Sequence, residues 1–209
     1  MNPAKSPSAS DAVREIATVR IELLQTKPLI WREVEVPTSI TLAVLHEIVQ
    51  IAIGWFDQHL WEFTIGKATY GPPDENDWGT ESHADKVFLC DVLKPKKTVI
   101  LYQYDFGDSW GHRLTITDIR AAEPDISYPR YVAGEGKGPP EDCGGIPGFY
   151  AMLKVLANPR HPQHAEIKEW AGDFDPKRVN EPAIRSAFLH IAKRLDPGRS
   201  PQSSEAQSA

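Results

Sequence analysis

The pattern of apolar and polar positions in the first quarter of the chain predicts a hairpin followed by a helix. Residues 16–24 are rich in aliphatic and β-branched side chains, and apolar residues alternate with charged ones between 29 and 36. A short polar link joins the two segments, which favours an antiparallel pair of strands. Between 41 and 55 the apolar residues recur every three or four positions, and Gly54 is placed to end the predicted helix.

The middle of the chain predicts further strands. We expect two short strands around Gly66, in the range 60–70, and two longer ones at 98–104 and 110–119 joined by a tight polar turn. Residues 71–86 are rich in glycine, proline and acidic side chains and predict a long loop.

A second irregular stretch, 123–148, is again rich in glycine and proline. Helical spacing of apolar residues then predicts three helices at 147–157, 164–171 and 181–195. These helices are too few and too short for a domain of their own, so we expect them to pack on the sheet.

This order of elements indicates an α+β fold. A hairpin, a helix across one face and then returning strands is the order in which a β-grasp (ubiquitin-like) sheet is built. By this analogy we predict a mixed sheet with β-grasp element order, helices packed on it and a helical C-terminal part.

The composition predicts one domain with two tails. The chain has 209 residues, of which 41% are hydrophobic and 25% charged, as in ordinary globular domains. The terminal segments 1–10 and 196–209 lack the apolar side chains needed to offset ordering, so we expect disorder there and one domain at 11–195. We expect Trp31, Trp55 and Trp110 to lie in the core, because each has apolar neighbours.

Charge and cysteine content narrow the classes of partner. The net charge is −6, and the lysines and arginines form no basic stripe, which argues against binding to nucleic acid. We see no apolar run of membrane-spanning length and no signal-peptide pattern, so we expect no membrane and a cytoplasmic location. Two cysteines without a CxxC pair suit a reducing compartment.

Two polar clusters stand where regular elements stop, and they supply the candidate binding residues. The first follows the strand at 98–104, and the second precedes the first of the C-terminal helices. Carboxylates with one histidine would suit a divalent metal, either of the Mg²⁺/Mn²⁺ type or of the Zn²⁺ type, although the spacing matches no known metal motif. The candidates are Asp105, Asp108 and His112 in the first cluster and Glu141, Asp142 and Cys143 in the second.

Each cluster also has a purely structural interpretation. Asp105, Gly107 and Asp108 are typical of a tight turn, and the acids of the second cluster could cap a helix. His112 shares one strand face with Trp110 and Leu114, which favours a core histidine over a metal ligand. The remaining histidines, His59 before a predicted strand among them, are weaker candidates.

Several short motifs follow one another between about residues 16 and 195. They are Pro28-Leu29-Ile30-Trp31-Arg32, Leu45-His46, Gly54-Trp55, His59-Leu60, Tyr104-Asp105-Phe106-Gly107-Asp108 with Trp110 and His112, Pro139 to Gly145 with Gly148 and Tyr150, and Trp170 with Asp173-Phe174-Asp175-Pro176. In this order the chain resembles the plasmid pRiA4b ORF-3-like family, whose members are often labelled as passenger proteins of insertion elements. The resemblance implies a fold but carries over no activity and no catalytic residues.

One position departs from that family. Similar proteins often have a cysteine just before the Pro-Pro-Glu-Asp run, where this chain has Gly138. The departure argues against a two-cysteine metal or redox role for the loop. The label resolvase, which sometimes accompanies the family, gains no support from an acidic chain in which we see no recombinase nucleophile motif.

These observations favour a binding or interaction module without enzymatic activity, with the two polar clusters as its functional surface and an unidentified protein or small molecule as its partner. The alternative is a metal-dependent hydrolase or nuclease that uses the same carboxylates.

Overall fold

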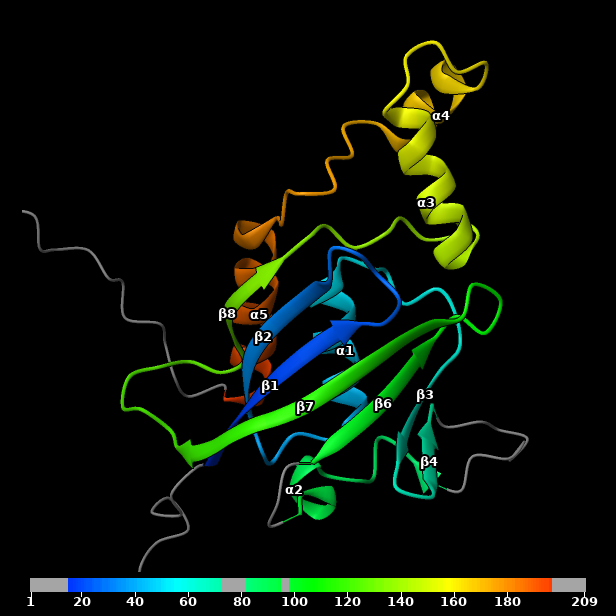
Figure 1. The fold of residues 1–209 in the computed structure, drawn as a ribbon. Coiled ribbons are helices and arrows are strands. Elements are labelled where there is room, and N and C mark those ends of the chain that lie inside the picture. Colours follow the sequence, from blue (N-terminus) through cyan, green and yellow to red (C-terminus); the bar gives the residue numbers. More distant parts are fainter. Residues whose placement is uncertain (1–14, 73–81, 95–97, 197–209) are drawn as a thin grey trace, which may run out of the picture.

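One sheet organises the part of the chain that the computed structural model describes, residues 15–72, 82–94 and 98–196 (Figure 1). Its strand order is β5-β4-β3-β6-β7-β1-β2-β8, and only the β4–β5 pair is parallel. The strands are β1 (Glu15–Leu23), β2 (Ile30–Pro37), β3 (Trp61–Ile65), β4 (Ala68–Gly71), β5 (Ser82–His83), β6 (Val99–Tyr104), β7 (Trp110–Ala121) and β8 (Arg130–Glu135). The predicted tails, apart from Asp196, and most of the predicted loop at 71–86 lie outside the described residues.

The predicted β-grasp order is wrong. A β-grasp sheet places a strand from after the helix beside the first strand and parallel to it. Here the neighbours of β1 are β2 and β7, and both run antiparallel to it. The strands after α1 return as the antiparallel meander β3, β6 and β7, so β7 reaches β1 from a hairpin and not from a parallel crossover. A final strand, β8, then extends the sheet beyond β2.

The predicted hairpin and first helix are present at nearly the expected bounds. Strands β1 and β2 pair along their full length, with Ile16 opposite Pro37 and Leu23 opposite Ile30. Helix α1 (Leu42–Ile53) begins where the Thr41 hydroxyl accepts a hydrogen bond from the Val44 N–H, and it ends at Gly54. Gly54 has a left-handed backbone, with φ of 102°, which glycine adopts without steric cost.

The helices form two groups (Figure 1). Helices α1 and α5 (Glu181–Leu195) lie on one face of the sheet, where Ile48, Val49 and Phe188 contribute to the core. Helices α3 (Gly145–Leu156) and α4 (His164–Ala171) instead project past the ends of the strands. The expectation that all three C-terminal helices cover the sheet is therefore correct for α5 alone. Helix α3 contributes Phe149 and Met152 to the core but extends past the strand ends, and α4 packs on α3. The short segment Leu89–Val92 forms helix α2.

Strand β8 was not predicted from the sequence. It lies inside the glycine- and proline-rich stretch and is the last strand at its edge of the sheet. Two arginines attach it to the rest of the molecule. Arg32 of β2 is buried and donates to the backbone oxygens of Ala52 (2.7 Å), Trp31 (2.8 Å) and Glu135 (3.1 Å). Arg185 of α5 donates to the Tyr131 oxygen at 2.9 Å.

Two of the three expected core tryptophans are buried. Trp55 and Trp110 are almost fully enclosed, and their rings lie 5.7 Å apart. Trp31 is only partly buried, and the guanidinium of Arg20 lies 4.0 Å from its ring centroid. The core prediction for Trp31 is therefore wrong, because buried positions alternate along β2 and Trp31 falls on the face that the helices leave uncovered.

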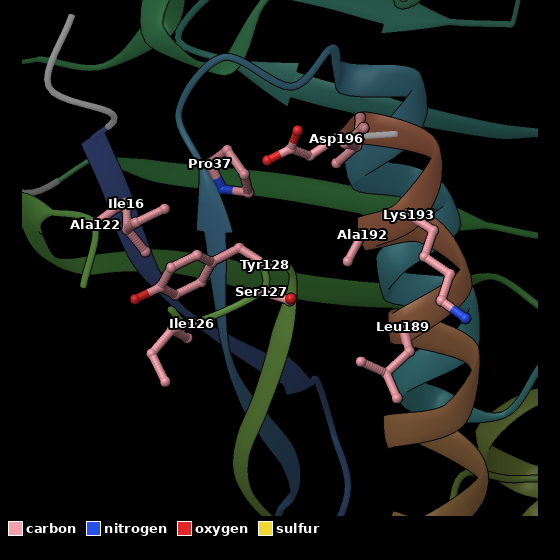
Figure 2. A pocket seen from close by; sticks show the side chains of 11 residues that line it. Ile16, Pro37, Ala122, Ile126, Ser127, Tyr128, Leu189, Ala192, Lys193 and Asp196 are labelled. Atoms are coloured by element: carbon pink, nitrogen blue, oxygen red, sulfur yellow. The ribbon is translucent and has the colours of Figure 1, made fainter. Parts of the chain in front are cut away.

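A small cavity lies at the beginning of β1, with α5 on one side of it (Figure 2). Ile16, Tyr128 and Leu189 are among its lining residues, and its volume is about 30 Å³. Such a cavity has room for roughly one or two water molecules. It therefore offers no ligand site. No helix in the described part of the chain is long and apolar enough to cross a membrane.

Candidate functional site

Three loops meet at the end of the sheet where β6 ends and β7 begins. They are the α1–β3 loop (54–60), the β6–β7 turn (105–109) and the β8–α3 loop (136–144). The Asp105 N–H donates to the Leu60 oxygen at 2.9 Å, which joins the first two loops. The Gly144 N–H donates to Asp108 Oδ2 at 3.1 Å, which joins the second and third. The two polar clusters that the sequence indicates are therefore side by side.

Helix α1 fixes the first loop through Asp57. His46 Nε2 lies 2.9 Å from Asp57 Oδ1, and the Asp57 N–H donates to Gln50 Oε1 at 3.0 Å. The His46 ring is stacked on Trp61 with centroids 3.9 Å apart, and burial lowers the pKa of His46. Because His46 and Gln50 are buried one turn apart on the same helix, they hold the loop that presents His59 in one position.

The β6–β7 turn orients Asp105. The side chain is largely buried, and Oδ1 accepts a hydrogen bond from the Gly107 N–H at 2.9 Å. This bond leaves Oδ2 directed towards His59, at 3.8 Å from Nε2. The turn thus supplies one oriented carboxylate oxygen to the space between the loops.

Directly after the β8–α3 loop, the first residue of α3, Gly145, comes into close contact with the β6–β7 turn. A Cβ atom at this position would lie 2.5 Å from the Asp108 backbone oxygen, so only glycine allows the approach. Trp55 adds a second attachment, since its indole N–H donates to the Pro139 oxygen at 2.8 Å. These contacts bring Asp142 to the site, where Oδ1 lies 3.2 Å from His59 Nε2.

Aspartates in left-handed backbone conformations recur in all three loops. Asp57, Asp105 and Asp142 have φ values of 56°, 55° and 58°. Such conformations are uncommon for residues other than glycine, although aspartate tolerates them better than most, and they concentrate at binding sites and turns. Two of these three aspartates are the carboxylates that face His59.

The structure thus assembles His59, Asp105 and Asp142 into one group. One ligand atom from each lies within 4.8 Å of the others. Asp105 and Asp142 are among the sequence-predicted candidates, whereas His59 was placed among the weaker histidines. Its position before a strand does not indicate contact with the two aspartates, although His59-Leu60 is one of the motifs of the family resemblance.

Asp108, Glu141 and Cys143 have other surroundings. Asp108 joins two loops, as described above, and Glu141 Oε1 accepts hydrogen bonds from the Tyr104 hydroxyl and from the Phe56 N–H. Burial and the Glu141 carboxylate raise the pKa of Tyr104. Burial, with Asp108 nearby, raises the pKa of the Cys143 thiol to about 12, so Cys143 stays protonated at neutral pH and is a poor nucleophile.

His112 is a core residue. It is 1% exposed, Nδ1 lies 3.1 Å from the Trp110 oxygen, and Nε2 has no hydrogen-bond partner in the described chain. Its ring contacts Trp55 edge-on, with centroids 5.2 Å apart. Burial lowers the pKa of His112 to about 4. These facts agree with the structural interpretation and place His112 outside the group around His59.

We expect His112 to make the stability of the protein depend on pH. The folded protein holds the ring neutral, with a pKa of about 4 against 6.5 for an unperturbed histidine, so the unfolded chain binds more protons between these values. The contribution of neutral His112 to the free energy of unfolding is fully present above pH 6.5. As the pH falls towards 4, this contribution, on the order of 3 kcal/mol, is lost. Urea unfolding between pH 4.5 and 7.5 measures the loss.

His112→Gln is the matched variant, because glutamine has no titration in this range. The free energy of unfolding of this variant should fall less between pH 6.5 and 4.5 than that of the wild type, since all other titratable groups are the same in the two proteins. Identical pH dependence in the two proteins would contradict the assignment.

A groove beside the polar group lies between α3 and α4. It has a volume of about 620 Å³, and its walls are mostly apolar. Trp170 is 52% exposed on one wall. Three carboxylates, those of Asp142, Glu166 and Glu169, line the groove, and no lysine or arginine is among its lining residues in the described chain. Asp142 belongs both to the groove and to the group around His59.

Large apolar side chains are also exposed on the loops. Phe56 is 77% exposed, Leu60 64% and Phe106 50%. Phe56 and Leu60 flank His59 in the sequence, and Phe106 follows Asp105. Groups of exposed apolar side chains are typical of surfaces that bind other molecules.

These features define the class: a mixed α/β protein with a mainly antiparallel sheet, one exposed loop site at the sheet end and an adjoining helical groove. The sequence profile of the plasmid pRiA4b ORF-3-like protein family matches residues 15–183. The chain therefore belongs to the plasmid pRiA4b ORF-3-like protein family.

Two further proteins are similar to this chain. Uncharacterized protein y4hQ of Sinorhizobium fredii (strain NBRC 101917 / NGR234) is 34% identical over 186 residues, which cover 87% of this chain and 95% of y4hQ. The crystal structure of the protein of unknown function MM3350 from Methanosarcina mazei Go1 is similar, with a TM-score of 0.75 and 28% identity. The match covers 82% of this chain and 98% of that one.

Proposed function

We propose that the protein is a binding module that recognises a basic amphipathic segment of a partner protein in the α3–α4 groove. The observation that carries the proposal is an apolar groove in which, among the described residues, the charged lining groups are all carboxylates. A volume of about 620 Å³ lies within the range of ligand-binding clefts.

The chemistry of the groove defines the partner. Met152, Val155 and Ile167 offer apolar contacts, and the exposed ring of Trp170 can stack on an alkyl chain or a guanidinium group. Glu166 and Glu169 lie on α4, so a segment with lysine or arginine beside its apolar residues would find opposite charges there. An acidic segment of the same shape would be repelled.

The test compares two synthetic peptides with the same leucine stripe, one with lysine and one with glutamate at the polar positions. Fluorescence anisotropy of labelled peptide measures binding to the full chain. We expect the lysine peptide to bind roughly tenfold or more tightly than the glutamate peptide, because only its charges are complementary to the groove.

Variants test whether the peptide binds in the α3–α4 groove. Trp170→Ala and the double change Glu166→Lys/Glu169→Lys should each weaken binding of the lysine peptide, and the double change should narrow the difference between the peptides. Leu101→Ala, at an exposed apolar residue on strand β6 of the sheet, is the matched control and should bind as the wild type does. Equal binding of both peptides, or no effect of Trp170→Ala, would refute the proposal.

A metal-dependent hydrolase or nuclease remains the second candidate function. The observation in its favour is the group formed by His59, Asp105 and Asp142, because a metal held there could activate water. Hydrolysis of a phosphodiester by the wild type in Mn²⁺ or Zn²⁺, lost in His59→Gln, would favour this function over the binding module.

A further inference from the structure

The imidazole of His59 lies within ion-pair distance of two carboxylates but makes no hydrogen bond to either of them. Its Nε2 atom is buried and has no hydrogen-bond partner in the described chain. Two carboxylate oxygens nevertheless lie close to it, at 3.2 Å in Asp142 and 3.8 Å in Asp105. A protonated histidine would donate its N–H along one of these directions, but neither contact has the geometry of a hydrogen bond.

We propose that His59, Asp105 and Asp142 form a binding site for one zinc ion. Three potential ligand atoms that converge without bonding to one another leave a common point for a cation between them. The proposal concerns these three side chains alone and would stand even if the α3–α4 groove bound no peptide.

The distances suit a small cation. A tetrahedral zinc ion with bonds of about 2.0–2.1 Å holds its ligand atoms about 3.4 Å apart. The separations from His59 Nε2, 3.2 and 3.8 Å, lie on either side of this value. The carboxylate oxygens of the two aspartates lie within 4.8 Å of each other. The side chain of Asp142 is 68% exposed, so it can rotate to close the remaining gap.

The donor set favours zinc over magnesium or calcium. Zinc takes imidazole nitrogen and carboxylate oxygen together, whereas the two lighter cations prefer oxygen ligands alone. Two carboxylates also supply the negative charge that a divalent ion requires. Because His59 and Asp142 are partly exposed, water can occupy the fourth position.

Neighbouring groups orient the three ligands. The Gly107 N–H holds Asp105 Oδ1 and so directs Oδ2 to the site. The ring of Tyr104 lies edge-on to the His59 ring, with centroids 5.7 Å apart, and limits its rotation. Metal sites depend on outer groups of this kind to fix the ligands before the ion binds.

The test is a titration of chelator-treated full chain with zinc chloride, followed by calorimetry and by metal analysis after dialysis. We expect one equivalent of zinc in the wild type and a rise in melting temperature on binding, because the ion binds only the folded site. His59→Gln and Asp142→Asn should each weaken binding roughly tenfold or more and abolish that rise.

Matched controls use residues of the same type away from the site. His190→Gln on α5 and Asp118→Asn on β7 are both exposed and should bind zinc as the wild type does. Asp142 is exposed, so Asp142→Asn should fold even if a change at the buried Asp105 does not. His59 does not line the groove, so peptide binding by His59→Gln separates failure of the metal site from failure of the groove.

Two results would overturn the proposal. The first is the absence of stoichiometric zinc at micromolar concentrations, which would identify the group as a simple histidine–aspartate pair. The second is equal zinc binding by the wild type, His59→Gln and Asp142→Asn, which would place the ion elsewhere on the chain.

Discussion

Replacing Trp110 with alanine is expected to lower the free energy of unfolding by about 3–5 kcal/mol. The Trp110 side chain is 1% exposed and contacts Trp55, so its removal leaves a large cavity at the end of the sheet. Trp55 in turn donates to the Pro139 oxygen, which anchors the β8–α3 loop. The substitution should therefore weaken the candidate site as well as the core. Chemical denaturation of wild type and variant measures the effect.

Trp110→Phe is the matched control. The indole N–H of Trp110 has no hydrogen-bond partner in the described chain, so phenylalanine removes volume without breaking a hydrogen bond. We expect a much smaller loss than for alanine. Unchanged stability of Trp110→Ala would show that the ring does not support the core.

Replacing Arg32 with alanine is also expected to lower the free energy of unfolding by about 3–5 kcal/mol. The Arg32 side chain is almost fully buried, and its guanidinium donates to three backbone oxygens, which belong to the end of α1, to β2 and to β8. The substitution leaves a cavity and removes the partners of buried carbonyl groups, and each of these losses is costly. Thermal or urea unfolding of the variant is the measurement.

Arg32→Met separates the two causes, because methionine fills much of the volume but donates no hydrogen bond. The loss for methionine should be about 1–3 kcal/mol, from the carbonyl groups left without a partner. If methionine were as destabilising as alanine, the carbonyl contacts would account for the whole effect. If both variants were as stable as the wild type, the proposed role of Arg32 would be wrong.

The local elements of the fold could be predicted from the sequence, but their arrangement could not. The alternation around Val34 and the spacing of apolar residues before Gly54 depend on near neighbours, so they indicate the hairpin and α1 correctly. Which strand lies beside β1 depends on contacts between distant segments, and element order alone suggested the wrong neighbour. Strand β8 is not evident from the sequence because Gly134 interrupts its pattern, Gly136 follows it directly and a buried arginine supports it.

The sequence indicated where the candidate site lies better than it indicated which residues form it. Aspartates and glycines at the ends of elements indicated the β6–β7 turn and the β8–α3 loop, because these residue types favour turns. Contacts with residues outside the loop, among them His46 and Gln50, hold the α1–β3 loop that carries His59, and no local pattern carries that information. The sequence also offers His112 as a candidate, but strand alternation directs the His112 ring into the core.

The contact between Arg185 and strand β8 has a consequence for the behaviour of the protein at high concentration. A strand at the border of a sheet exposes backbone groups onto which another chain can add, and this is a common start of aggregation. The Arg185 guanidinium already donates a hydrogen bond to the Tyr131 carbonyl of β8. It also donates to Glu181 Oε2 at 3.1 Å, which holds the guanidinium in place. At the opposite border, β5 pairs through only two residues. Recruitment of a further strand from a second molecule is therefore disfavoured at β8, and β5 offers only a short template for it.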